Sequence, residues 1–197
     1  MGACLNCFKS KNSQDKNNQI ELSSTQNMCM CKCGLAGEKV RIVPREETSV
    51  FSVTGSGTVI GSCGLDCDTG YWECVVGKNP AQVQIGVKRY SKETSLESLL
   101  SSKGGDWCME ADDLAFKEGD VVGIYWDQTD LPMLSFTLNG VLMTKCSITR
   151  VRPAQDIYPA VSITDGATCD IVFDAAYFKH PPASKKFTMI VCATQLI

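Results

Sequence analysis

Short apolar runs separated by turn-forming residues make up the chain from about residue 39 onward. Gly, Asn and Asp stand between the runs, and several runs alternate apolar and polar positions. This pattern predicts an all-β chain folded as an antiparallel sandwich of two sheets. The eleven expected strands are residues 39–43, 49–54, 57–61, 71–76, 83–87, 120–126, 134–138, 141–144, 157–163, 169–173 and 187–193.

Two turns between these runs can be tested by register. Asn139-Gly140 predicts a two-residue type I′ hairpin, because both central positions of that turn need a positive φ. Such a loop places Leu138 opposite Val141 and matches the apolar faces of the two runs. At 164–168 a two-residue loop would set an aspartate against a valine, so we expect a longer or bulged hairpin turn there.

One short helix is expected, at about residues 95–101. Thr94 and Glu97 have the spacing of a capping box, in which each side chain caps the other's backbone N–H. A Leu-Leu pair follows, and Gly104-Gly105 would end the helix.

The composition changes sharply along the chain. Residues 9–19 contain no apolar side chain, and such a segment cannot offset the entropy of ordering. Residues 28–37 are rich in cysteine instead. We therefore expect a flexible polar tail at 1–27, a cysteine-rich lead-in at 28–38 and one folded domain at 39–197.

Composition also narrows the function classes. A length of 197 residues suits one domain, and the net charge of −3 offers no basic excess for phosphates, so nucleic-acid binding is not expected. The twelve cysteines occur without a signal-peptide h-region or an N-glycosylation sequon. Several replace small apolar residues within the runs, which predicts free thiols in a reducing cytoplasm. There is no apolar stretch of 18 residues, so no membrane-spanning helix is expected.

Five motifs occur in an order that resembles the SPRY (B30.2-like) domain family. They are YWECVV at 71–76, QIGV at 84–87, GDVVGIYWD at 119–127, LSFTLNG at 134–140 and IYPAVSI at 157–163. The resemblance covers roughly residues 39–197 and implies a bent, concanavalin-like β-sandwich whose loops bind other proteins. The stretch between Val87 and Phe116 differs from the peptide-binding members, so their contact residues are not carried over.

The favoured function is therefore a non-catalytic module that binds a protein or peptide partner through loops. The longest loop-rich stretch is 88–118, and aromatic residues in such a setting are enriched at interface hot spots. For each aromatic side chain the alternative is a contact with the core. The predicted partner-binding residues are Tyr90, Asp106, Trp107, Met109, Trp126 and Asp127.

The N-terminus is a candidate membrane tether. Removal of Met1 would expose Gly2 for myristoylation, although the motif asks for Ser or Thr where this chain has Asn6. Cys4 and Cys7 lie close by for palmitoylation, and two lipid anchors hold a membrane where one does not. The alternative is an ordinary start with two exposed thiols.

Metal and catalytic sites are not predicted. Cys29, Cys31 and Cys33 have C-x-C spacing, which suits structural zinc poorly, and Cys63 and Cys67 have no clear partner pair. His180 is the only histidine, and neither a nucleophile motif nor a nucleotide-binding motif accompanies it. No cofactor is expected. Two alternatives to the binding module stay open: a structural subunit of a larger assembly and a small cysteine-dependent enzyme.

Overall fold

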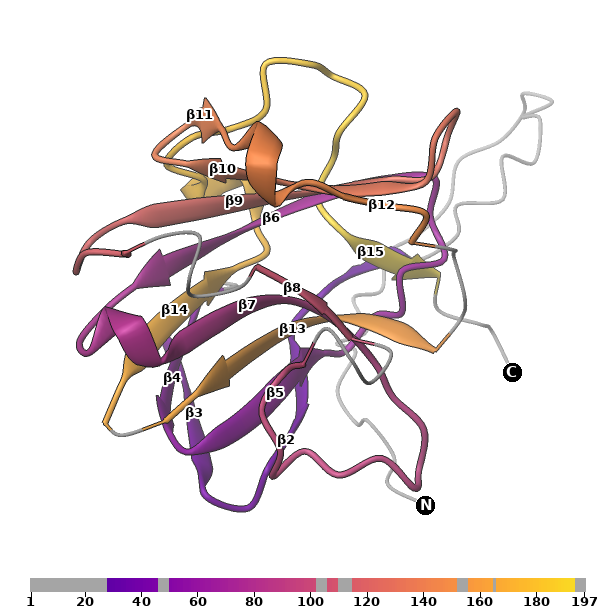
Figure 1. Ribbon diagram of the computed structural model, residues 1–197. Helices are drawn as coiled ribbons and strands as arrows, with labels where there is room; N and C mark the ends of the chain where they lie inside the picture. The colour runs from indigo at the N-terminus through magenta and orange to yellow at the C-terminus, as the bar shows by residue number, and fades with distance from the viewer. Residues whose placement is uncertain are drawn as a thin grey trace, which may run out of the picture.

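The computed structural model describes residues 28–45, 50–101, 106–109, 115–151, 156–164 and 166–193 (Figure 1). The strands are β1 Met28–Met30, β2 Cys33–Ala36, β3 Val40–Arg45, β4 Val50–Gly55, β5 Gly57–Gly61, β6 Thr69–Val76, β7 Val83–Arg89, β8 Asp106–Cys108, β9 Val121–Asp127, β10 Met133–Leu138, β11 Val141–Leu142, β12 Ile148–Thr149, β13 Ile157–Ile163, β14 Thr168–Val172 and β15 Val191–Ala193. Three single 3-10 turns complete the described elements: η1 Pro80–Gln82, η3 Thr144–Cys146 and η4 Ala175–Tyr177.

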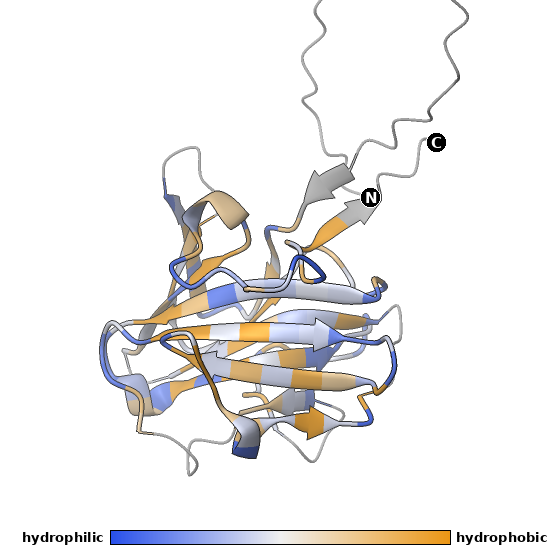
Figure 2. Ribbon diagram, turned by 90° about the horizontal axis from the view of Figure 1, so that it is seen from above, coloured by the Kyte–Doolittle hydropathy of each residue, from blue (hydrophilic) through white to orange (hydrophobic). Residues whose placement is uncertain are grey.

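Two antiparallel sheets pack face to face, which confirms the predicted sandwich. The eight-stranded sheet has the order β11-β10-β9-β6-β14-β4-β3, with β12 paired to β10. The five-stranded sheet has the order β2-β5-β13-β7-β8, and β1 pairs with β15 in a small third sheet. Hydrophobic and hydrophilic residues alternate along several strands when the sandwich is viewed from above (Figure 2). The inward residues of that alternation supply the core.

The core between the sheets is built from large apolar side chains. Trp72, Trp126 and Phe136 from the eight-stranded sheet are fully buried, as is Ile85 from the five-stranded sheet. Burying one such side chain contributes about 1.5–3 kcal/mol. The sandwich therefore has a large enough core to need neither a metal nor a disulfide for its stability.

The hairpin at Asn139-Gly140 forms as predicted. Leu138 lies opposite Val141, and the two turn residues have φ values of 51° and 81°. The side-chain oxygen of Asn139 also accepts the Val121 N–H at 2.9 Å, so this asparagine joins the hairpin to β9. Val141, however, is 70% exposed, so the expected match of apolar faces does not bury it.

The hairpin expected at 164–168 does not form. Strand β13 lies in the five-stranded sheet and β14 in the eight-stranded sheet, so the two strands do not pair. The chain crosses between the layers there, and Ala167 donates its N–H to the Thr164 carbonyl at 2.8 Å to close a turn. The predicted hairpin was wrong because it assumed that neighbouring strands share a sheet.

The segment after η4 crosses the outer face of the eight-stranded sheet and is fastened by a buried carboxylate. Glu73 lies on the central strand β6 and has no exposed surface. Its two oxygens accept the backbone N–H groups of Lys179 at 2.7 Å and His180 at 2.8 Å. The Tyr71 hydroxyl lies 2.9 Å from Glu73 Oε1 and 2.8 Å from the His180 carbonyl oxygen.

The protonation state of Tyr71 follows from its burial beside Glu73. Burial, and then the negative charge of Glu73, raises the pKa of Tyr71, so the phenol stays protonated and can donate. A buried carboxylate without donors would be costly, and here three donors surround it. Glu73 therefore couples the central strand to the C-terminal segment.

We expect Glu73→Ala to lower the free energy of unfolding by about 2–4 kcal/mol, because it removes charge-assisted hydrogen bonds that fasten the C-terminal segment. Urea unfolding followed by tryptophan fluorescence measures this. Glu118→Ala, at an exposed position, is the matched control and should change stability by less than about 0.5 kcal/mol. Equal losses for the two variants would contradict the role of Glu73.

Candidate functional site: an aromatic edge beside a fastened loop

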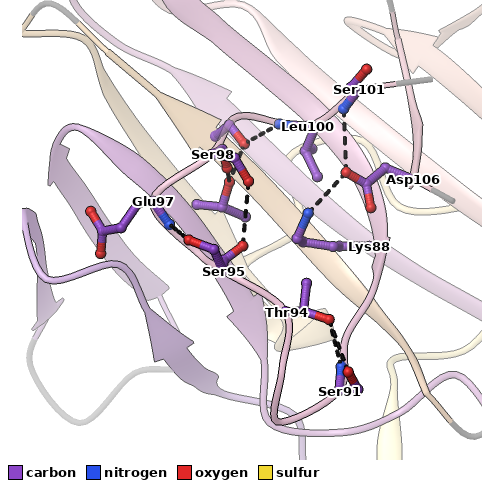
Figure 3. A network of polar contacts seen from close by, with 11 residues as sticks. Lys88, Ser91, Thr94, Ser95, Glu97, Ser98, Leu100, Ser101 and Asp106 are labelled. Atoms are coloured by element: carbon purple, nitrogen blue, oxygen red, sulfur yellow. Dashed lines mark hydrogen bonds and ion pairs between the residues drawn. The ribbon is translucent and has the colours of Figure 1, made fainter. Parts of the chain in front are cut away.

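A long loop covers the outer face of the five-stranded sheet. After β7 the chain runs through residues 90–101 without regular structure and lies over β5 and β13 (Figure 3). Leu96 and Leu100 are buried against Ile60, Ala160 and Cys108, forming a second, smaller apolar cluster. The loop is therefore part of the packed domain.

The short helix expected at 95–101 is absent. Backbone groups of this segment pair with the sheet: the Leu96 carbonyl accepts the Thr58 N–H at 2.8 Å. Glu97 does not close a capping box, because its carboxylate accepts the Glu38 N–H at 2.5 Å. Ser95 instead accepts the Glu97 N–H at 3.1 Å, a local bond that competes with helix formation.

Two buried hydroxyl groups fix the middle of the loop. Thr58 donates to the Ser98 carbonyl at 2.6 Å, and Ser162 accepts the Leu100 N–H at 2.9 Å. The hydroxyl oxygens of Thr58 and Ser162 lie 2.6 Å apart. Because Thr58 spends its proton on Ser98, Ser162 must donate to Thr58.

A buried ion pair fixes the end of the loop. Lys88 Nζ lies 2.9 Å from Asp106 Oδ2, and the two side chains are only 5% and 6% exposed. The same carboxylate oxygen accepts the Ser101 N–H at 3.3 Å. Lys88 lies opposite Asp106 in the β7–β8 pair, so one interaction joins the edge strand to both its neighbour and the loop.

Two pairs of side chains lie near this network, one on each face of the sheet edge. We call the four residues together the aromatic edge: Arg89 with Trp107, and Tyr90 with Tyr158. The Arg89 guanidinium lies 5.7 Å from the centre of the Trp107 ring and 3.2 Å from a carboxylate oxygen of Asp156. The Tyr90 and Tyr158 rings meet edge to face, with centroids 6.3 Å apart. All three aromatic side chains of the edge are half-buried.

The structure separates the six predicted partner-binding residues. Tyr90 and Trp107 both reach the surface, but Tyr90 packs on the loop-covered cluster and Trp107 against the main core. Asp106 is buried in its ion pair. Met109 is 3% exposed and Trp126 is fully buried, with its indole N–H donated to the Cys67 carbonyl. These three side chains are therefore buried in the folded domain.

Asp127 lies elsewhere, on the eight-stranded sheet. Its carboxylate pairs with Lys186 at 2.7 Å, and this ion pair together with the bond from Thr129 lowers the pKa of Asp127 against the opposing effect of burial. It lines a groove of about 330 Å³ between the β9–β10 face and the C-terminal segment. Tyr125, Leu142 and Phe187 supply apolar walls to this groove.

We also examined the described part of the chain for a metal site and for a membrane-spanning helix. There, no group of three or more His, Cys, Asp or Glu side chains is arranged to hold a metal ion. None of its helices is long and apolar enough to cross a membrane. Gly2, Cys4 and Cys7 lie outside the described residues.

Comparison with known proteins identifies the domain. The SPRY domain family model matches residues 69–176, which is more than half of the chain and runs from β6 to η4. The chain belongs to the SPRY domain family. SPRY domains generally serve as protein-interaction modules. In this one, β1 to β5 and β15 lie outside the matched residues and complete the sheets.

Solved structures agree on the fold. A crystal structure of a human SPRY domain superposes with a TM-score of 0.51 at 17% sequence identity, covering 69% of this chain and 98% of that one. The receptor binding domain of botulinum neurotoxin type G gives a TM-score of 0.30 at 11% identity, covering 76% and 42%, too low to show a common fold. The search of curated proteins returned no match.

Sequence analysis missed three residues that shape the site. Arg89 and Tyr158 lie at or near strand ends, where nothing in the local pattern separates a surface contact from an ordinary exposed side chain. Lys88 continues the VQIGV run, and its burial depends on Asp106, 18 residues away. The position of Lys88, a charged residue directly after an apolar run, was the one signal in the sequence that it could be buried.

We expect Lys88→Met to lower the free energy of unfolding by about 3–5 kcal/mol, because it leaves the Asp106 carboxylate buried without its cation. The double variant Lys88→Met/Asp106→Leu should recover most of this loss, since apolar pairs often replace buried ion pairs at little cost. Urea unfolding measures both.

Arg89→Met is the control for this pair. Its ion pair with Asp156 is about half exposed, so the change in stability should stay below about 1 kcal/mol. A double variant as unstable as Lys88→Met alone would show that the ion pair does not carry the effect.

Proposed function

We propose that this SPRY domain is a non-catalytic module that binds a protein or peptide partner through the aromatic edge. The observation that carries the proposal is the half-buried Trp107 with the Arg89 guanidinium over its ring. The Tyr90–Tyr158 pair lies on the opposite face of the same sheet edge, because Trp107 packs on the main core and both tyrosines pack on the outer cluster. Tryptophan, tyrosine and arginine are the residue types that dominate binding energy at protein interfaces.

The loop network supports the same proposal. The Lys88–Asp106 pair and the Thr58–Ser162 hydroxyls hold the loop and the edge strand before any partner arrives. A surface fixed in advance loses little conformational entropy on binding. The aromatic edge therefore suits recognition of a short peptide, where ordering costs decide affinity.

The alternative, a structural subunit of a larger assembly, is favoured by a different surface. Val141 and Leu142 on the edge strand β11 are 70% and 56% exposed, beside the groove that Asp127 lines. Exposed apolar side chains next to a groove suit a permanent interface. The two surfaces lie on different sheets, so variants can separate them.

We expect Trp107→Ala to weaken peptide binding at least tenfold. The probe is a set of peptides selected from a random display library on the intact chain, each then titrated by fluorescence anisotropy. Removal of a tryptophan at an interface hot spot typically costs about 2 kcal/mol or more, which gives the expected factor.

Tyr177→Ala is the matched control, because this tyrosine is 48% exposed in η4, outside the aromatic edge. Melting curves confirm that each variant is folded at the titration temperature. Undiminished binding by a folded Trp107→Ala variant would refute the assignment. Loss of binding in Leu142→Ser instead would move the site to the groove.

The second part of the proposal concerns where the domain acts. The domain works in the cytoplasm, and acyl groups on Gly2, Cys4 and Cys7 hold it at a membrane surface. Eight cysteines whose side chains the structure describes take part in no disulfide, which supports a reducing compartment. Lys9, Lys11 and Lys16 would add attraction to anionic lipid.

Within the family, the nearest relative that we propose is SPRY domain-containing protein 7. The support is the cysteine-rich N-terminal stretch together with the C-terminal segment YFKHPPASKKF at 177–187. In the structure the start of that segment is held by Glu73, which accepts the backbone N–H groups of Lys179 and His180.

We expect Gly2→Ala to shift the protein from the membrane to the soluble fraction of the cell. Without a myristoyl group, membrane binding would lose the first of its two anchors. Fractionation with intact-mass spectrometry of the native protein measures both effects. Asn18→Ala, a change in the same N-terminal segment but outside the myristoylation motif, is the control. An unmodified Gly2 together with free Cys4 and Cys7 would reject the tether.

A further inference from the structure

Two cysteines far apart in sequence face each other where the lead-in joins the domain. Cys33 on β2 lies opposite Gly61 on β5, and the Ser62 N–H donates to the Lys32 carbonyl at 2.7 Å. The β2–β5 ladder ends at Cys33–Gly61, and extending its antiparallel register by two residues sets Cys31 opposite Cys63.

The type of pair matters for what these cysteines can do. Hydrogen-bonded and non-hydrogen-bonded pairs alternate along an antiparallel ladder. Because Ser62 bonds to Lys32 through the backbone, the extended register gives Cys31 and Cys63 a non-hydrogen-bonded position. Cα atoms at such a position lie about 4.5 Å apart, inside the range of about 4.4–6.8 Å that a disulfide spans.

The two thiols also point into the same part of the core. Cys31 is 0% and Cys63 is 1% exposed, and both belong to the main apolar cluster. A hydrogen bond joins the two thiols, and that bond is the largest cause of a lowered pKa of Cys31. Ser62 adds further hydrogen bonds to Cys31, which favour its thiolate.

We propose that Cys31 and Cys63 form a redox pair that closes to a cross-strand disulfide when the protein meets a peroxide. The site is separate from the aromatic edge and does not depend on the function proposed for it. Its oxidant is hydrogen peroxide or another small hydroperoxide, and its reductant is a dithiol.

The chemistry balances with these two thiols and one peroxide. The Cys31 thiolate attacks one peroxide oxygen, the O–O bond breaks, and the leaving hydroxide takes up a proton to give water and a sulfenic acid. The Cys63 thiolate then attacks that sulfur, the S–O bond breaks, and a second water leaves. The two sulfurs lose two electrons and the peroxide oxygens gain them.

A second close pair of thiols shows that strand register determines whether two cysteines can form a disulfide. Cys74 and Cys169 hydrogen bond to each other, but Cys74 lies opposite Ile171 and Cys169 opposite Val76. Diagonal neighbours across a sheet lie about 7–8 Å apart, beyond what a disulfide spans without backbone movement. Burial raises the pKa of Cys74, which opposes thiolate formation.

The bond would fasten the lead-in to the sandwich. Cys31 follows β1 directly, and β1 pairs with β15, so the segment carries both chain ends of the described structure. Neither thiol is exposed, whereas Lys32 and Leu35 are, so the oxidant reaches the pair when this segment opens. Oxidation would then trap the closed arrangement.

The test uses the full chain, reduced and then treated with hydrogen peroxide. Remaining thiols are blocked with N-ethylmaleimide after unfolding, and digested peptides are mapped by mass spectrometry. We expect one main cross-link, between Cys31 and Cys63, reversed by dithiothreitol. The melting temperature should rise by about 5–10 °C on oxidation, as a disulfide across a loop of this length predicts.

Trypsin leaves Cys29 and Cys31 in one peptide and Cys63, Cys67 and Cys74 in another, so fragment-ion sequencing of the linked peptides places the bond. A Cys29→Ala chain is mapped in parallel. Cys63→Ala should lose both the cross-link and the rise in melting temperature, and Cys169→Ala should keep both. If Cys63→Ala does not fold, Cys31→Ala replaces it, and the map of the unaltered chain stands by itself. A main cross-link elsewhere, or both thiols blocked after peroxide, would overturn the proposal.

Discussion

A carboxylate buried against the outer face of the central strand holds the C-terminal segment in place. Glu73 accepts two backbone N–H groups from residues 179 and 180, and the segment then runs on to donate and accept along β6. Thr188 accepts the Tyr71 N–H at 2.8 Å, and Ile190 accepts the Cys31 N–H at 3.0 Å. The buried charge of Glu73 and these backbone bonds therefore together position β15, and through it β1.

On the five-stranded sheet, too, a buried ionic group holds an irregular segment against the outer face. Neither outer face of the sandwich is covered by a helix of the described chain; an irregular segment crosses each face, and a buried ionic group fastens it. An irregular segment cannot satisfy its own backbone, so its N–H and carbonyl groups must find partners in side chains or strands. Glu73 serves this need on one face, and Asp106 with Ser162 serves it on the other.

Local patterns in the sequence correctly predicted features that neighbouring residues determine, such as the turn at Asn139-Gly140. Trp126 was predicted to meet a partner because it lies at a strand end, yet it is fully buried, and the alternation through Val122 and Ile124 was a local signal for this that the sequence analysis did not use. The helix at 95–101 was wrong because Glu97 binds a backbone group 59 residues away. Aromatic contacts such as Tyr90 with Tyr158 depend on strand order, which no single strand reveals.

Strand order also separates the cysteine pair near β2 from the aromatic edge at β8. The lead-in strand β2 and the edge strand β8 are the opposite borders of the five-stranded sheet. Four strand spacings of roughly 4.8 Å put about 19 Å between them. The described chain begins at β1, which leads directly into the border strand β2 and away from the border that carries Trp107. A covalent change beside β2 would accordingly act on how the domain is held, while the surface that recognises a partner stays as it is.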